Sequence, residues 1–517
     1  MKRALFLIGI NFLLISLGAE EVRWFRTVQF DSYDRVYGVR SIDERESAQV
    51  NCYRFTLDEA GAPVLIEYVN RGKALDAPVR DVLRMEISYG EGFRERINLT
   101  RSGQPAADSQ GVYRYRLILD SEGTPAASFN YDRYGNLFPD HAGISSRRWE
   151  RDEEGRISSI MYLDRYGARI ANEEGVWEER RFYDSASRLS EVVSLNKDLL
   201  PLGGVQYRWD GENNLTEEII LNAALDRGAD LMGISRIARS WDRMGNCLTV
   251  QYYNEGDEPT NDENGVASYL YGYDEWGNPV LEERYGADGE PTSARDGIFR
   301  IDWIAYDQGR VLERNYYDHE GQPVSDEWGA SSCRWVIDEA GLVREEKYYG
   351  PDNDLIQDRW GIAIYQWDYD EAGNRIEGRC YNDWESLALD TRNIAVYRWD
   401  YDEEGRMTGE HHYNASGELS EDSQGIARLT WAYDGEGNRI LQEQYGLYGQ
   451  LRADHNGVAV YKWNYDRYGN LLEESYGGID GQSIENKGGV ALSRWEYDED
   501  GMPLASLTLD RNNEVRE

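Results

Sequence analysis

The chain has 517 residues, and its 52 glycines, 38 tyrosines and 16 tryptophans stand against only 12 prolines and 7 methionines, a mixture that suggests a periodic sequence. Its 96 acidic and 56 basic residues give a net charge of −40, which disfavours nucleic acid or an anionic membrane as a partner because phosphate groups repel such a field. Since 40% of the residues are hydrophobic and 12% aromatic, we expect the chain to fold around a core built largely of rings.

The first nineteen residues have the organisation of a secretory signal peptide. Lys2 and Arg3 precede about fifteen apolar residues that end at Gly18 and Ala19. A retained membrane anchor would need about 20 apolar residues, so we favour cleavage after Ala19. We therefore predict that residues 1–19 are removed and that the product is secreted or periplasmic, with no transmembrane segment.

A repeat of 32 residues organises nearly the whole mature chain. A glycine column is occupied at Gly245, Gly277, Gly309, Gly341, Gly373, Gly405, Gly437, Gly469 and Gly501. A tryptophan column is occupied at Trp303, Trp335, Trp367, Trp399, Trp431, Trp463 and Trp495. A tyrosine column is occupied at Tyr253, Tyr285, Tyr317, Tyr349, Tyr381, Tyr413 and Tyr445. We expect one continuous domain, with degenerate repeats over 20–110 and the regular array over 111–517.

Each unit is expected to contain a β-hairpin. Segments such as Asp402-x-x-Gly405 place Asp first and Gly fourth in a type I turn, and a left-handed Gly then closes a three-residue loop with a bulge. The predicted structural turn residues are Gly373, Gly405, Gly437 and Gly469. Strands such as 395–401 alternate aromatic and polar residues, which is typical of a half-buried strand. The sequence thus predicts an all-β protein, in which tandem 32-residue β-hairpin repeats form one elongated, spiralling or solenoid-like antiparallel sheet.

The predicted loop also sets a register. It pairs Tyr401 with Met407, Trp399 with Gly409, and Ala395 with Tyr413. A small residue then faces a large one, as in a packed cross-strand pair. This register turns a polar column toward the aromatic side, namely Glu283, Lys347, Arg379 and Glu443. A two-residue loop would pair Trp367 with Ile376 and Trp463 with Leu472, but the turn sequence lacks the two positive-φ residues that such loops need. We favour the first register.

Five segments read Tyr-Asp-x-x-Gly-Asn, at Tyr131–Asn136, Tyr273–Asn278, Tyr369–Asn374, Tyr433–Asn438 and Tyr465–Asn470. They resemble the YD repeat of Rhs-type bacterial surface and secreted proteins over most of residues 110–517. The resemblance implies a long spiral sheet of hairpins and a non-enzymatic scaffold with surface or carbohydrate-linked roles. The 32-residue period is longer than that of YD repeats, and only sixteen residues follow Gly501, which disfavours a toxin-encapsulating shell. The segments Gly425–Trp431 and Gly457–Trp463 also resemble WG-repeat proteins.

Aromatic residues at a fixed spacing are suited to stacking on successive rings of a polysaccharide. The tryptophan column is expected in the core instead, because it shares a strand face with Ala and Tyr in a chain that is poor in Leu and Ile. The tyrosine column is expected to be more open, although a structural role is the stronger alternative for it. The candidate ligand-binding residues are Tyr253, Tyr285, Tyr317, Tyr349, Tyr381, Tyr413 and Tyr445.

We expect no metal, no cofactor and no catalysis. Acidic turns such as Asp402–Glu404 offer oxygen ligands, but the glycine-rich calcium-binding nonapeptide is missing and the turn Asp is expected to bond the backbone. The sequence contains no nucleophile elbow, zinc-protease motif, phosphate loop or dinucleotide fingerprint. The predicted function is an exported, non-catalytic, monomeric scaffold that binds a protein or glycan at the bacterial cell envelope. The alternative is a polysaccharide-active enzyme with acidic catalytic residues.

Overall fold

The computed structural model describes residues 21–31, 33–69, 78–101, 103, 105–133, 135, 137–164, 167–306, 311–435, 438–465, 471–497, 503–512 and 514–515. The predicted signal peptide lies outside these residues. Within them, no helix is long and apolar enough to cross a membrane. One short helix, α1 (Glu44–Ser47), and one 3-10 turn, η1 (Val79–Asp81), accompany 32 strands in the described chain.

The strands, in chain order, are β1 (Glu21–Phe30), β2 (Val36–Ile42), β3 (Cys52–Leu57), β4 (Pro63–Val69), β5 (Arg84–Gly90), β6 (Phe93–Leu99), β7 (Arg114–Leu119), β8 (Pro125–Tyr131), β9 (Ser146–Arg151), β10 (Ile157–Leu163), β11 (Glu178–Tyr183), β12 (Leu189–Leu195), β13 (Pro201–Trp209), β14 (Leu215–Leu221), β15 (Arg236–Trp241), β16 (Cys247–Tyr253), β17 (Ser268–Tyr273), β18 (Pro279–Tyr285), β19 (Arg300–Tyr306), β20 (Val311–Tyr317), β21 (Ser332–Ile337), β22 (Val343–Tyr349), β23 (Ile364–Tyr369), β24 (Arg375–Tyr381), β25 (Val396–Tyr401), β26 (Met407–Tyr413), β27 (Arg428–Tyr433), β28 (Arg439–Tyr445), β29 (Val460–Tyr465), β30 (Leu471–Gly477), β31 (Leu492–Tyr497) and β32 (Pro503–Leu509).

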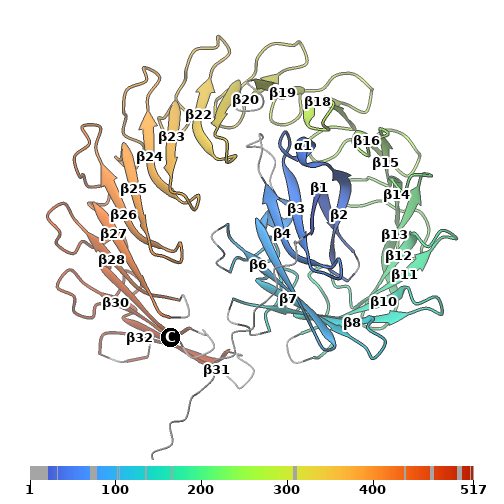
Figure 1. The fold of residues 1–517 in the computed structure, drawn as a ribbon, viewed down its shortest axis with the longest axis horizontal. Coiled ribbons are helices and arrows are strands. Elements are labelled where there is room, and N and C mark those ends of the chain that lie inside the picture. Colours follow the sequence, from blue (N-terminus) through green and yellow to red (C-terminus); the bar gives the residue numbers. More distant parts are fainter. Residues whose placement is uncertain are drawn as a thin grey trace, which may run out of the picture.

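All the strands join one antiparallel sheet. β1 lies between β2 and β3, and from β3 onward each strand pairs with the next in the chain as far as β32. The sheet is open and curls on itself, so that β1 to β4 lie inside the curve made by the later strands (Figure 1). The predicted all-β fold, built from hairpin repeats in one spiralling antiparallel sheet, is confirmed.

The hairpin turns follow the predicted chemistry. The Gly405 amide donates to the Asp402 carbonyl over 3.0 Å, and the carboxylate of Asp402 accepts the amide of Arg406 over 2.8 Å. Gly405 has a φ of 75° and Gly373 a φ of 85°, in the left-handed region that favours glycine. The other two predicted turn residues, Gly437 and Gly469, lie outside the described residues. The Asp of the turn therefore bonds the backbone, as expected from the sequence.

The predicted register is right for the first pair and wrong beyond it. Tyr401 pairs with Met407, but the register then shifts, and Trp399 lies opposite Glu410 and Tyr413 opposite Val396. Thr408 is the extra residue of a β-bulge, and one extra residue moves every later side chain of that strand to the other face. Similarly, Tyr381 pairs with Ile364 in place of Ala363, and Tyr445 with Arg428 in place of Ala427. The two-residue-loop alternative is also wrong, since Trp367 pairs with Gly378 and Trp463 with Glu474.

The bulge determines which side chains of the two strands share each face of the sheet. We call the side that carries Tyr397 and Trp399 of β25, and their equivalents, the aromatic face, and the side that carries Arg398 the arginine face. The polar column that the predicted register turned toward the aromatic rings lies on the arginine face, as seen in the pairing of Arg379 with Gln366. Trp335 of the tryptophan column is buried, and its other six members are half-buried.

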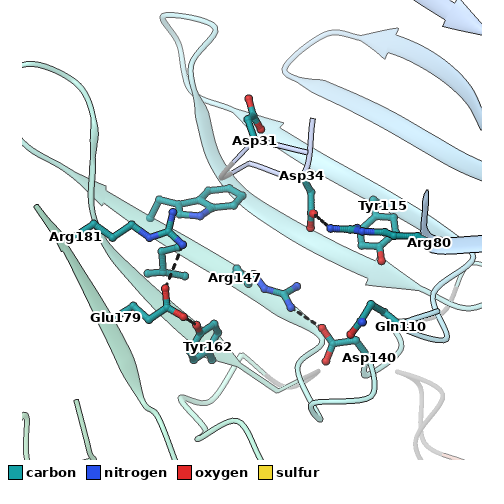
Figure 2. Close-up of a pocket in the computed structure, with 12 residues that line it drawn as sticks. Asp31, Asp34, Arg80, Gln110, Tyr115, Asp140, Arg147, Tyr162, Glu179 and Arg181 are labelled. Atoms are coloured by element: carbon teal, nitrogen blue, oxygen red, sulfur yellow. Dashed lines mark hydrogen bonds and ion pairs between the residues drawn. The ribbon is translucent and has the colours of Figure 1, made fainter. Parts of the chain in front are cut away.

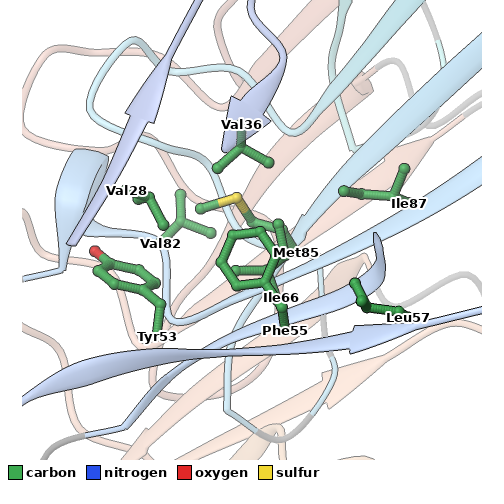
Figure 3. Close-up of a cluster of buried hydrophobic side chains, with 9 residues drawn as sticks. All are labelled: Val28, Val36, Tyr53, Phe55, Leu57, Ile66, Val82, Met85 and Ile87. Atoms are coloured by element: carbon green, nitrogen blue, oxygen red, sulfur yellow. The ribbon is translucent and has the colours of Figure 1, made fainter. Parts of the chain in front are cut away.

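Buried apolar residues gather at several places along the sheet. Small and branched residues in the links between hairpins, such as Ile394 and Ala395, are fully buried. One apolar cluster is formed by side chains of the first five strands and by Val82 (Figure 3). Its members are Val28, Val36, Tyr53, Phe55, Leu57, Ile66, Val82, Met85 and Ile87. The curl brings distant segments together, and the Arg26 guanidinium donates to the side chain of Asn278 over 3.1 Å.

Candidate functional site

The predicted ligand-binding tyrosines all lie half-buried on the arginine face, away from the tryptophan column. Arginines of the preceding strand cover the faces of several of these rings, at distances from guanidinium carbon to ring centroid of 3.9 Å for Arg236 and Tyr253, 5.4 Å for Arg300 and Tyr317, 4.9 Å for Arg334 and Tyr349, 4.6 Å for Arg398 and Tyr413, and 4.4 Å for Arg428 and Tyr445. The hydroxyls of Tyr285 and Tyr445 donate to Glu283 and Glu443, each over 2.7 Å. The ring surfaces available for stacking on a ligand are thereby reduced.

A polar pocket lies elsewhere, between the tip of the β1–β2 hairpin and the aromatic face of β7 to β11. It has a volume of about 300 Å³ (Figure 2). Asp31 and Asp34 reach it from the tip, and Tyr33 of the same tip packs edge-on against Trp149 of β9 with ring centroids 5.2 Å apart. The pocket therefore depends on a contact between segments more than a hundred residues apart.

The floor of the pocket uses equivalent positions of three consecutive units. The second residue of the first strand is Tyr115 in β7, Arg147 in β9 and Glu179 in β11. The fourth residue is Trp149 in β9 and Arg181 in β11. In later units these positions are mostly aromatic or apolar, as in Tyr397 and Trp399. Charged side chains thus replace part of the aromatic face beneath the β1–β2 tip.

Three arginine–carboxylate pairs line the pocket. Arg147 Nη2 lies 2.5 Å from Asp140 Oδ2, and Arg80 Nη2 lies 2.9 Å from Asp34 Oδ1. Arg181 Nη2 lies 3.1 Å from Glu179 Oε2 (Figure 2). Such charge-assisted bonds fix both partners, so the pocket presents a preorganised ring of alternating donors and acceptors.

The arginines keep the pocket carboxylate of the tip ionised. Burial alone would raise the pKa of Asp34, but the charges of Arg80, Arg96 and Arg147 outweigh it and lower the pKa. Burial likewise opposes the charge of Arg147, yet Asp140 and Asp34 raise the pKa of its guanidinium. The charges of the pocket therefore stabilise one another.

Neutral polar groups complete the lining. The Tyr162 hydroxyl donates to Glu179, and the Tyr115 hydroxyl donates over 2.7 Å to Asp108, which lies behind it. The indole N–H of Trp149 is buried and has no hydrogen-bond acceptor among the described residues. A pocket of guanidinium, carboxylate and hydroxyl groups beside an aromatic pair is suited to a ligand rich in hydroxyl groups, because each hydroxyl both donates and accepts.

Sequence reasoning missed all of these residues, because it sought sites in the regular columns. The signal that points to them is the break in those columns, where Arg147, Glu179 and Arg181 stand at positions that are mostly aromatic or apolar in later units. Nothing in the repeat pattern marks Asp31 and Asp34 of the β1–β2 tip as pocket residues.

No protein-family model matches the chain, and no curated protein matches it significantly. Among solved structures, the crystal structure of TcdB2–TccC3–TEV is similar at 10% identity and a TM-score of 0.34, over 95% of this chain and 27% of that one. The Tc holotoxin pore of Photorhabdus luminescens is similar at 12% identity and a TM-score of 0.35, over 95% of this chain and 26% of that one. The chain thus spans about a quarter of the chains it matches. Similarity at this level assigns neither a family nor a function.

Proposed function

We propose that the protein is an exported, non-catalytic repeat scaffold that binds a glycan at the bacterial cell envelope, in the pocket under the β1–β2 tip. The observation that carries the proposal is the ring of paired arginines and carboxylates, made by Arg147 with Asp140 and Arg181 with Glu179, inside a cavity of about 300 Å³. Pockets of this size are at the lower end of those that enclose small ligands.

A glycan fits the chemistry of the pocket better than a protein segment. Sugar hydroxyls match alternating donors and acceptors, while the C–H face of a sugar ring packs on an aromatic ring such as Trp149. The flat arginine face, where the tyrosine column lies, offers a protein partner only side chains that already pair with each other. We therefore place the ligand in the pocket and keep the tyrosine column as the competing site for the test.

The absence of catalysis is part of the proposal. A glycosidase needs a carboxylic acid whose pKa is raised, so that it can give a proton to the leaving oxygen. The pocket carboxylate Asp34 has a lowered pKa, and Asp140 and Glu179 are each bonded to an arginine. This arrangement favours binding over hydrolysis.

Export and scaffold character rest on the sequence. The basic and apolar segment 1–19 has the form of a signal peptide, and the Tyr-Asp-x-x-Gly-Asn segments resemble the YD repeats of surface proteins. In the described residues, such a segment forms the turn between β23 and β24. An open sheet built from such hairpins repeats the same positions along its length. The residue types at these positions depart from the pattern at the pocket.

A glycan array with purified residues 20–517 tests the proposal, followed by calorimetric titration of the selected glycan. We expect Glu179→Gln to weaken binding about tenfold or more, because a charged acceptor contributes roughly 1.5–3 kcal/mol. Glu377→Gln, which alters a similar arginine pair on the arginine face, is the matched control and should bind normally.

Two results would overturn the proposal. Loss of binding in Tyr413→Ala with normal binding in Glu179→Gln would move the site to the tyrosine column. Release of reducing ends from the selected glycan, abolished by one Asp or Glu substitution, would establish the alternative of a polysaccharide-active enzyme.

A further inference from the structure

A second, much smaller cavity adjoins the pocket and is strongly cationic. Its volume is about 20 Å³, and Asp34 and Tyr115 line both cavities. Four arginines line it, from the β1–β2 tip and from β6 and β7, namely Arg35, Arg94, Arg96 and Arg116. Asp34 is its one acidic lining residue. Such an excess of positive charge stands out in a chain whose net charge is −40.

Two of these arginines have carboxylate partners and two do not. Arg35 lies 2.6 Å from Asp31, and Arg116 lies 2.6 Å from Glu95. Arg94 and Arg96 form no ion pair with any described residue, although Arg96 is buried and Arg94 is half-buried. Burial lowers the pKa of both guanidinium groups, and the opposing charges of Asp34 and Asp108 near Arg96 and of Asp31 near Arg94 do not offset it. A buried cation without a hydrogen-bonded counter-charge is costly, so an anion in the cavity would stabilise both groups.

The surroundings of Arg96 define where that anion would bind. Phe30 and Tyr115 cover the guanidinium faces, at 4.7 Å and 4.1 Å from its carbon to the ring centroids. Nη1 donates to the backbone carbonyl of Asp34 over 3.1 Å. Nε and Nη2 are buried and have no acceptor in the described structure. These two atoms form one edge of the planar group, so a single acceptor in the plane can accept from both.

A third donor lies on the same side of the sheet. Arg94 of β6 pairs with Leu117 of β7, which in turn pairs with Ser128 of β8, so that Arg94 and Ser128 flank Leu117 on the aromatic face. Ser128 is only 2% exposed, lines the small cavity, and its hydroxyl has no partner among the described residues. Unpaired donors on β6 and β8, the two strands that flank β7, therefore line one cavity.

We propose that this cavity is a binding site for one small monatomic anion of the size and charge of chloride, held by the Nε and Nη2 groups of Arg96 and the hydroxyl of Ser128. A cavity needs about 10–15 Å³ to hold one water-sized particle, so 20 Å³ is enough for a single small ion. The anion offsets part of the positive charge of Arg94 and Arg96 and thereby stabilises the packing of the β1–β2 tip on β6 to β8. The site is separate from the proposed glycan pocket, and either proposal can fail alone.

Thermal unfolding of residues 20–517 in sodium chloride and in sodium gluconate, at matched ionic strength, tests the site. A ligand that binds only the folded chain raises its stability as concentration rises. Between about 5 mM and about 500 mM salt, we expect chloride to raise the Tm of the wild type by roughly 2 °C more than gluconate does. Gluconate is too large for the cavity.

Variants separate the site from general salt effects. Ser128→Ala removes one donor without adding volume, and it should reduce the chloride-specific shift by at least half while the Tm in gluconate stays near that of the wild type. Arg96→Met should abolish the shift. Arg314→Met is the matched control, because Arg314 also lies over two rings, those of Tyr316 and Trp335, and its removal should leave the shift intact.

A crystal grown in sodium bromide gives a second readout. We expect one anomalous peak between Arg96 and Ser128. Two results would overturn the proposal, namely the same chloride-specific shift in wild type, Ser128→Ala and Arg96→Met, or a cavity that holds water and shows no bromide peak.

Discussion

On the aromatic face, the buried His412 pairs with the half-buried Glu410, and Nε2 of the imidazole lies 2.8 Å from Oε1 of the carboxylate. The other ring nitrogen, Nδ1, lies 2.9 Å from the carbonyl oxygen of Ile426, fourteen residues downstream. Gln444 and Asn130 donate in the same way to the carbonyls of Val458 and Ile144, also fourteen residues downstream. His412 therefore takes the place of a side-chain amide that bonds each hairpin to the link that follows it.

This pair predicts a pH-dependent stability. Burial alone would raise the pKa of Glu410, but hydrogen bonds from His412 and Trp399 outweigh it and lower the pKa. A lowered pKa stabilises the fold above the unfolded-state value of about 4.3, and this stability is lost as pH falls through the folded-state pKa. Urea denaturation should show Glu410→Gln to be less stable by about 1–3 kcal/mol at pH 7 and much closer to wild type near pH 3. An equal difference at both pH values would contradict the role given to the carboxylate.

The hairpin turns predict a graded series at Gly245. Its φ is 78° and no atom lies within 4 Å of an added Cβ, so only backbone conformation is tested. Asn213 already occupies this column with a φ of 67°. We expect Gly245→Asn to be nearly neutral, Gly245→Ala to cost about 1 kcal/mol, and Gly245→Val to cost more. Thermal melts that rank Val with Asn would show that the turn does not need a left-handed residue.

Two cysteines should be unreactive in the folded protein. All four are free, and Cys333 and Cys380 are buried. Burial raises the pKa of each of these two thiols to about 12, so the reactive thiolate is scarce at pH 8. Alkylation followed by mass spectrometry should modify them in denaturant but not in buffer. Rapid labelling of Cys333 or Cys380 in the native chain would show that the strand carrying it is mobile or exposed, and would contradict the prediction.

Asp140 is expected to be the most sensitive single residue of the pocket. Its carboxylate accepts from Arg147 over 2.5 Å and from the amides of Ala142 and Ile144 over 3.1 and 3.0 Å. Asp140→Ala leaves Arg147 buried without this partner, which should cost roughly 3–5 kcal/mol in denaturant unfolding. Asp152→Ala removes the same turn bonds together with a more exposed ion pair to Arg156, and it is the control that should lose less. Equal losses would mean that the buried ion pair contributes nothing.

The hairpins and their turns could be predicted because each depends on local chemistry. Asp402 and Gly405 lie three residues apart and carry the whole signal for the turn. The second strand was assigned to the wrong face because the bulge at Thr408 leaves no mark in the sequence that distinguishes it from a regular strand. The one extra residue determines the face on which Tyr413 lies, and the same shift occurs in the hairpins that carry Tyr253, Tyr285, Tyr349, Tyr381 and Tyr445.

The pocket could be predicted only in part. Arg147 and Glu179 break the aromatic columns and are visible in an alignment of the repeats. The tip that closes the pocket contributes Asp31, Tyr33 and Asp34, and the contact of Tyr33 with Trp149 depends on how far the sheet curls. That curl is the sum of small twists over many strand pairs, and no single residue encodes it.

The most direct test of the account is a crystal structure of residues 20–517 with the glycan selected by the array. The account predicts density for a sugar ring under the β1–β2 tip, with hydrogen bonds to Arg147 and Glu179 and a face against Trp149. Sugar density along the tyrosine column of the arginine face, with the pocket holding only water, would contradict it.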